Sequence, residues 1–239
     1  MKAIKLLTGV FILALAAGCA PFDKIYSHEF SSGYFKLKSP GTISEKVYLT
    51  KTEDSITVFS LIPDRMPKMP DISQPKAIRI SSVIPGSYLY NSTFVKTSLD
   101  ADLSTVLLKF RPAAADVQPQ LNTDVNGVLY AGFRKDFFKI KTGFSAINVA
   151  STFVRHTGFD FGFFAGIGNT FVSPTVTENK IIQEYNGIVF QKGFSVFGTF
   201  ENMSVGLAIG FDNLLDDNKS IWIYNNKPWL GIVLGIANF

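Results

Sequence analysis

The clearest pattern in the sequence lies near its end, where hydrophobic residues occupy every second position from Met203 to Phe211. The residues between them are small or polar: Ser204, Gly206, Ala208 and Gly210. A period of two predicts a β-strand whose two faces meet different environments. The same alternation recurs at 121–134, 156–171 and 188–200. Large side chains on one face and small polar ones on the other are typical of a transmembrane β-barrel wall.

The composition agrees with a barrel. The chain has 239 residues, 46% of them hydrophobic, with 23 Phe and 19 Gly. Its mean hydropathy of +0.20 is high for a soluble protein. Outside the N-terminus, however, no apolar run approaches the ~18 residues of a membrane helix. A soluble β-sandwich, with its phenylalanines facing a second sheet, is the alternative. The recurrence of Phe-rich faces on strand after strand favours the barrel.

Prolines divide the chain into two regions. Residues 46–51 and 55–62 predict two strands joined by a polar turn, which is a β-hairpin outside the membrane. The proline-rich stretch 63–75 favours an extended linker, because proline cannot donate to a β-ladder. We therefore predict a tether and hairpin region over residues 19–75 and the barrel over residues 76–239. The clear strands number roughly six, and doubtful segments raise this to about eight, the smallest size usual for bacterial barrels.

The first residues predict a targeting signal, because a basic start precedes an apolar stretch at 6–17. Its end, Leu15-Ala16-Ala17-Gly18-Cys19, resembles the lipobox of bacterial lipoproteins, although Ala16 stands where leucine is usual. The resemblance implies a signal peptide over residues 1–18 and a lipid anchor on Cys19, with palmitate among its acyl chains. An ordinary signal peptide with a chance cysteine is the alternative. Cys19 is the only cysteine of the chain, so the monomer contains no disulfide.

Residues 220–235, with the motif Lys227-Pro228-Trp229-Leu230-Gly231, look like the tail of small outer-membrane β-barrel proteins of the Bacteroidota. Residues 104–138, with Lys109-Phe110-Arg111-Pro112, are similar to that family as well. The resemblance implies a small barrel in the outer membrane, but it implies no activity. Phe239 resembles the terminal aromatic residue that the barrel-assembly machinery reads, although the apolar positions 230–236 have the opposite parity.

Charged residues recur on the predicted inward faces: Asp100, Asp102, Asp124, Arg134, Asp160 and Asp212. We expect them to form a charge network in the barrel lumen. Such a lumen could conduct ions or bind a small polar ligand. The alternative is a salt-bridge network that fills a narrow barrel, because buried charges need partners. The small size of the predicted barrel favours the filled interior.

Aromatic residues near the end of the chain predict a membrane girdle. Trp222, Tyr224 and Trp229 are flanked by Lys219 and Lys227. Amphipathic rings prefer the headgroup layer of a bilayer, so we expect these three at the membrane–water boundary. A partner-binding aromatic patch is the alternative.

Few residues offer chemistry. The chain has two histidines, His28 and His156, and Gly158 stands where lipid A deacylases of this shape carry a serine beside the base. The acidic loop 212–217 lacks the spacing of an EF-hand. With few His and Cys, a zinc site lacks ligands. We therefore predict no catalytic residue, no metal site and no cofactor.

These patterns together predict a lipid-anchored outer-membrane β-barrel that acts without catalysis as a scaffold or partner-binding component. A narrow channel or solute-binding barrel is the alternative, and a lipid-modifying enzyme is a weaker one. The expected partners are outer-membrane lipid, the barrel-assembly machinery during biogenesis, and an unidentified membrane or periplasmic protein. Nucleic acid is not expected, because no dense cluster of Lys and Arg with interleaved aromatics occurs.

Overall fold

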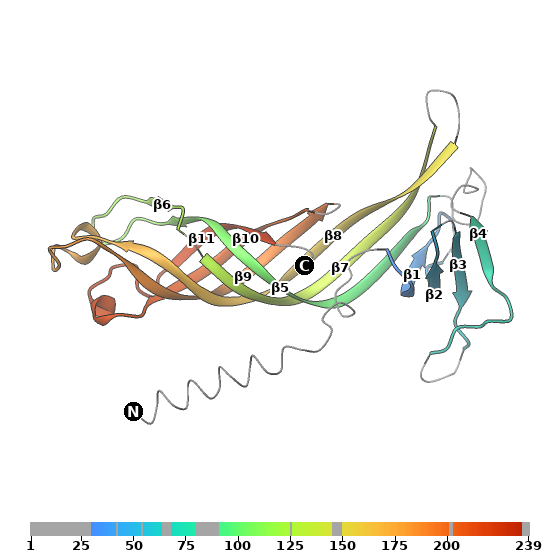
Figure 1. The fold of residues 1–239 in the computed structure, drawn as a ribbon, viewed down its shortest axis with the longest axis horizontal. Helices are drawn as coiled ribbons and strands as arrows, with labels where there is room; N and C mark the ends of the chain where they lie inside the picture. The colour runs from blue at the N-terminus through green and yellow to red at the C-terminus, as the bar shows by residue number, and fades with distance from the viewer. Residues whose placement is uncertain are drawn as a thin grey trace.

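The computed structural model describes residues 30–41, 43–53, 55–63, 68–79, 91–124, 126–144, 150–200 and 203–235. Within these ranges the strands form one antiparallel sheet, so the predicted all-β antiparallel class is confirmed (Figure 1). No helix in this part of the chain is long and apolar enough to cross a membrane.

Six strands of the sheet pair in a ring, and we call them the ring strands: β5 (Thr93–Arg111), β7 (Asn126–Phe144), β8 (Ala150–Val172), β9 (Tyr185–Phe200), β10 (Met203–Leu214) and β11 (Pro228–Gly235). Each pairs antiparallel with the next in this order. β11 then pairs back with β5, with Leu230 opposite Phe110. The pairings therefore return to the strand from which they start.

The described residues place fewer strands in this ring than the eight we predicted. Residues 140–144 and 150–154 form no additional strands; they continue β7 and β8 past the ring, with Phe144 opposite Ala150. The short strand β6 (Gln120–Asn122) pairs with β5 at Lys109–Arg111, beyond the part of β5 that pairs with β7. Periodicity cannot count strands here, because one strand runs through both the ring and its extension.

A smaller group of strands extends the sheet at one end: β1 (Gly33–Lys38), β2 (Glu45–Lys51), β3 (Ser55–Ser60) and β4 (Lys76–Arg79). The predicted hairpin is confirmed, because β2 pairs antiparallel with β3. The hairpin is not separate from the ring, since β1 pairs with both β2 and the start of β5. β4 pairs with β3, so residues just beyond the predicted boundary at Pro75 belong to this end sheet.

One face of the end sheet is buried against the ring strands. Phe35 and Val47 from this sheet join Phe94 of β5 and Phe138 of β7 in one hydrophobic cluster. Their alternation with exposed residues such as Lys36 and Lys46 explains why β1 and β2 form strands here: one face is buried and the other is solvated.

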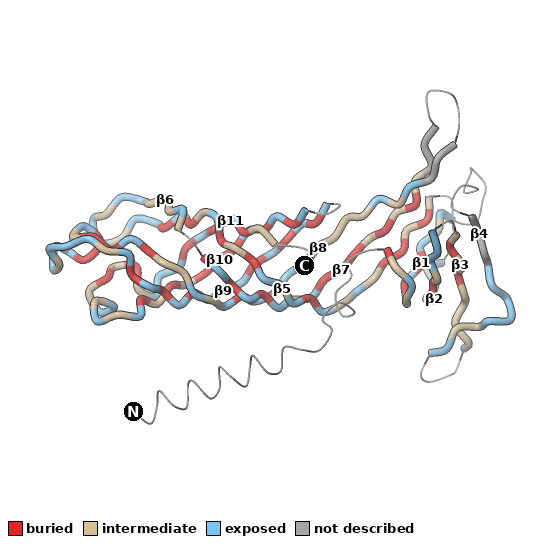
Figure 2. The backbone as a smooth tube through the Cα atoms, viewed as in Figure 1, coloured by how far each residue is buried: buried red, intermediate tan, exposed pale blue. Residues whose placement is uncertain are grey.

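The ring strands alternate between buried and exposed residues almost without interruption, as β9 and β10 show (Figure 2). The exposed positions carry large apolar side chains, which we call the outer apolar face: Leu99, Leu103, Leu129, Phe133, Phe161, Phe163, Phe194, Val196, Leu207, Ile209, Leu230 and Ile232. Leu207 is 71% exposed, whereas polar residues such as Asp212 are buried. The usual arrangement of a soluble protein is therefore inverted on these strands.

Candidate functional site: the charged interior

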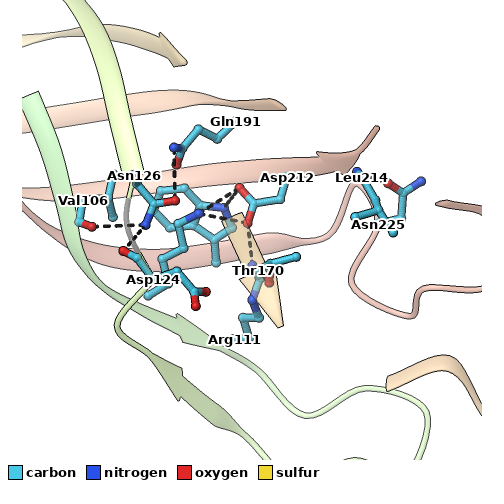
Figure 3. A network of polar contacts seen from close by, with 11 residues as sticks. Val106, Arg111, Asp124, Asn126, Thr170, Gln191, Asp212, Leu214 and Asn225 are labelled. Atoms are coloured by element: carbon cyan, nitrogen blue, oxygen red, sulfur yellow. Dashed lines mark hydrogen bonds and ion pairs between the residues drawn. The ribbon is translucent and has the colours of Figure 1, made fainter. Parts of the chain in front are cut away.

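Asp212 of β10 is the centre of one buried ion-pair cluster (Figure 3). Its carboxylate lies 3.1 Å from Lys109 Nζ and 2.5 Å from Arg111 Nη2. It also accepts a hydrogen bond of 2.8 Å from Trp229 Nε1. Arg111 further donates to Thr170 Oγ1 at 3.4 Å. One carboxylate thus joins β5, β10 and β11 across the interior.

A register shift brings the two cations of this cluster inside. Even-numbered residues of β5 point inward as far as Val106, but beyond it Lys109 and Arg111 are buried instead. The pairing of β5 with β11 shifts at this point, between Ile232 and Val233. A β-bulge of this kind inserts one residue and reverses the parity of the residues after it. In the sequence, only the change of parity between Val106 and the two cations could have indicated the bulge.

The predicted aromatic girdle is wrong. Trp222, Tyr224 and Trp229 are 3%, 3% and 1% exposed, so none reaches the outer surface. Arg111 lies over the rings of Trp222 and Tyr224, at 5.0 and 5.3 Å from their centroids. Burial raises the pKa of the Tyr224 hydroxyl, which lies in the connection after β10. These rings cover the buried cations, because a desolvated guanidinium is attracted to an aromatic face.

A second cluster surrounds Arg134 of β7, nearer the end sheet. Arg134 pairs with Asp100 at 3.3 Å and with Asp136 at 2.9 Å. Asp136 also contacts His156 Nε2 at 2.8 Å, and the His156 ring stacks on Phe138. His156 is thus held by an acidic and an aromatic neighbour inside the sheet.

The hydroxyl of Tyr130 donates to the buried carboxylate of Asp160 on β8, beside this second cluster. The predicted network therefore exists as two clusters. Four of its predicted members are buried: Asp100, Arg134, Asp160 and Asp212.

The other two predicted members are half-buried. Asp102 lines a cavity of about 10 Å³ together with Asp100 and Tyr130, which is about the room one water molecule needs. Asp124 lies next to the first cluster, where its backbone carbonyl accepts from Asn126 Nδ2 at 2.6 Å (Figure 3). Asn126 Oδ1 in turn accepts from Gln191 at 3.2 Å.

Apolar side chains fill the interior between the two clusters. Val128 lies on β7 between Asn126 and Arg134, and it packs in one buried cluster with Val106, Tyr130, Phe164, Phe197, Ala208, Trp229 and Val233. Glycine makes room for the largest ring: a Cβ on Gly210 would lie 2.3 Å from Trp229 Cζ2. A glycine at this inward position therefore leaves the space that the indole ring of Trp229 fills.

Three residues singled out in the sequence lie outside the part of the chain that the structure describes. These are Cys19, His28 and Phe239. Among the residues that the structure describes, no group of His, Cys, Asp and Glu gathers in a way that could hold a metal ion. In the acidic loop, Asp216 accepts hydrogen bonds from Asn218 N and Tyr185 Oη at 2.8 and 2.9 Å, so its carboxylate organises the loop.

No family model matches this chain, and comparisons with curated proteins and with solved structures give no match either. The resemblance to small barrels of the Bacteroidota stays a prediction.

Proposed function

We propose that this chain is a lipid-anchored protein of the bacterial outer membrane whose ring strands form a closed transmembrane β-barrel, and that it acts without catalysis as a scaffold. The observation that carries this proposal is the outer apolar face, which is present on every ring strand around an interior of paired charges. Exposed apolar surface of this extent is unfavourable in water but matches the hydrocarbon core of a bilayer.

The connections between ring strands support an orientation in the membrane. At one end, only residues 201–202 separate β9 from β10. At the other end, the connections span residues 112–125, 173–184 and 215–227. Outer-membrane barrels have short periplasmic turns and longer extracellular loops. The end sheet lies at the short-turn end (Figure 1), so we place it on the periplasmic side, where a lipid anchor at Cys19 would also lie.

The filled interior favours a scaffold over a channel. The two ion-pair clusters and the apolar layer between them leave about one water's room beside Asp102. We therefore expect no sustained current when the protein is reconstituted in planar bilayers. Sustained single-channel current would instead support the alternative that the protein is a narrow channel.

Lys192 of β9 is a charged residue among the apolar side chains of the outer face. It is exposed between Phe190 and Phe194. A lysine in this position can extend its apolar stem along its neighbours and carry the ammonium group to the polar boundary. The nearer polar region in sequence is the connection 173–184, at the end of the ring with the long connections, because β9 begins at Tyr185.

The lipid-modifying enzyme is the weaker alternative, because Asp136 and Phe138 already hold His156 in the packed interior. We expect His156→Ala to leave the membrane lipid profile of cells that produce the protein unchanged. A changed lipid profile would support the alternative that the protein is a lipid-modifying enzyme.

The test of the barrel is migration in SDS gels with and without boiling. A closed barrel keeps its hydrogen-bond ladder in SDS until it is heated, so unboiled protein from the outer-membrane fraction should migrate differently from boiled protein. A band that does not shift, from protein that leaves the membrane fraction without disruption of the bilayer, would favour a soluble β-sandwich on a lipid tether.

A further inference from the structure

The face of the end sheet that carries Lys36 lies on the same side of the sheet as the outer apolar face. Lys36 of β1 lies directly opposite Val95 of β5. Directly paired residues point to the same side of a sheet. Val95 itself is buried, and along β5 it is followed on that side by the exposed residues Thr97 and Leu99, of which Leu99 is the first residue of the outer apolar face. At 3.4 Å per residue, Val95 lies about 14 Å along the strand from Leu99.

Two lysines face each other on this surface. Lys36 pairs directly with Lys46 of β2, and both are exposed. Like charges directly opposite each other destabilise a β-sheet. Within the described residues, neither lysine makes an ion pair. Glu45 follows the opposite parity of β2, on the side of Val47. The ion pairs of the described residues therefore leave this repulsion in place.

A groove runs beside the lysine pair. Its volume is about 540 Å³, and its lining includes Lys36, Lys46, Lys68, Tyr34, Leu61 and Thr97. The hydroxyl of Tyr34 donates to the backbone carbonyl of Lys68 at 3.0 Å, which places a third lysine at the groove. The Tyr34 ring packs edge-on against Tyr48 at 4.9 Å between centroids. The groove therefore combines three amines with amphipathic rings.

The same end of the ring carries further outward cations beside aromatic rings. Arg155 of β8 lies 4.9 Å from the Phe200 ring centroid, and Lys135 of β7 lies 5.8 Å from that of Phe137. Cations with amphipathic or aromatic neighbours are typical of the headgroup layer. In the proposed barrel, these residues put the groove at the level of the phosphates of the adjoining leaflet.

We propose that the groove lined by Tyr34, Lys36, Lys46 and Lys68 binds the phosphate headgroup of an anionic phospholipid in the periplasmic leaflet. This inference rests on the proposed barrel. The anion offsets the repulsion between the paired lysines, and the tyrosines lie beside its glycerol region. The bound lipid thereby holds the end sheet against the membrane surface.

The test is native mass spectrometry of the full-length protein, reconstituted in nanodiscs of equal parts phosphatidylethanolamine and phosphatidylglycerol and then released. The variant is Lys36→Gln, Lys46→Gln and Lys68→Gln together. The control removes the same number of charges at the loop end, with Lys180→Gln, Lys219→Gln and Lys227→Gln. Each lysine near an anionic surface contributes about a fivefold gain in affinity. We therefore expect the groove variant to lose about a hundredfold of its preference for phosphatidylglycerol, and the control to keep it.

Three results would overturn the proposal. The groove variant could retain phosphatidylglycerol as well as the control does. Excess inorganic phosphate could displace the lipid completely, which would make free phosphate the ligand. An acidic protein could co-purify through the same lysines while phosphatidylglycerol retention stays unchanged. Failure of the barrel itself would look different: the protein would then not enter nanodiscs, and its unboiled gel band would not shift.

Discussion

Trp229 and Asp212 join two neighbouring strands from inside the molecule, with the indole N–H donating to the carboxylate at 2.8 Å. Both side chains are essentially fully buried. The ammonium of Lys109 lies 4.8 Å from the centroid of the same indole ring. The ring that we expected at the membrane boundary instead closes off a buried carboxylate and one of its cations. Interior electrostatics and interior packing therefore depend on the same few residues.

Replacing Asp212 should destabilise the fold strongly. Asp212→Asn keeps the shape of the side chain but leaves Lys109 and Arg111 as buried cations without their counter-ion. Breaking a buried pair from one side costs about 3–5 kcal/mol. The measurement is the temperature at which the unboiled gel band converts to the boiled position. Asp217→Asn, an exposed change in the nearby 3₁₀ turn η5 (Asp217–Ser220), is the control and should leave that temperature unchanged. Equal temperatures for both variants would contradict the buried cluster.

Adding a methyl group at Gly210 should also destabilise the protein, because its Cβ would meet Trp229 at 2.3 Å. Overpacking of this kind costs about 1–3 kcal/mol. Gly198→Ala on the adjacent strand is the matched control, because no heavy atom lies within 4 Å of the added Cβ. Unfolding in urea, followed by the gel shift, compares the two.

A second substitution tests whether the clash at Gly210 is with the ring itself. The atoms in contact belong to the six-membered ring of Trp229. Combining Gly210→Ala with Trp229→Leu should therefore cost less than the sum of the two single changes. Additive costs would show that the methyl group acts through something else.

A charged substitution on the outer apolar face should have different effects on stability in a membrane protein and in a soluble protein. Leu207 is 71% exposed at the middle of the outward positions of β10. Leu207→Arg should cost about 2–4 kcal/mol if this position lies in the bilayer core. On a soluble protein the same exposed change should stay within about 0.5 kcal/mol. Ile182→Arg, 95% exposed in the connection between β8 and β9, is the control and should be neutral in both cases. The fraction of assembled protein in the outer membrane, together with the urea midpoint, separates the two outcomes.

Tryptophan fluorescence tests the position of the aromatic rings directly. The chain has only two tryptophans, Trp222 and Trp229, and both are buried in the structure. We expect neither acrylamide nor phospholipids brominated near the headgroup to quench their emission efficiently. Leu207→Trp supplies an outward ring for comparison, which phospholipids brominated along the acyl chain should quench. Strong quenching of the natural tryptophans by the headgroup-brominated lipid would show that they lie at the membrane boundary, as the girdle prediction has it.

Local alternation was sufficient to predict the two faces of most ring strands. On β10 every position from Met203 to Gly210 has the exposure that the period of two predicts. The same holds for the inward carboxylates Asp100, Asp160 and Asp212, which are all buried. This succeeds because side chains alternate strictly along a regular strand, so sequence order alone assigns each residue to a face.

Irregular backbone limited the prediction elsewhere. The bulge in β5 turns Lys109 and Arg111 inward, and no residue type marks its position in the sequence. Trp229 was assigned outward from the usual preference of tryptophan, whereas its pairing opposite Gly210 places it inside, where glycine leaves space for the ring. Residue preference is a weak guide where a neighbouring strand decides the available volume.

The order of residues is enough to establish that this protein is built from antiparallel strands, with large apolar side chains on one face and small or charged ones on the other. The identity of neighbouring strands is known only from the folded chain: β11 returns to β5, β1 joins the same strand further along, and Lys36 therefore faces Lys46 on the same side of the sheet as Leu99. This division arises because alternation is a local property of each strand. Pairing partners and the packing of an interior depend on residues far apart in the chain, which meet only when the whole sheet has formed.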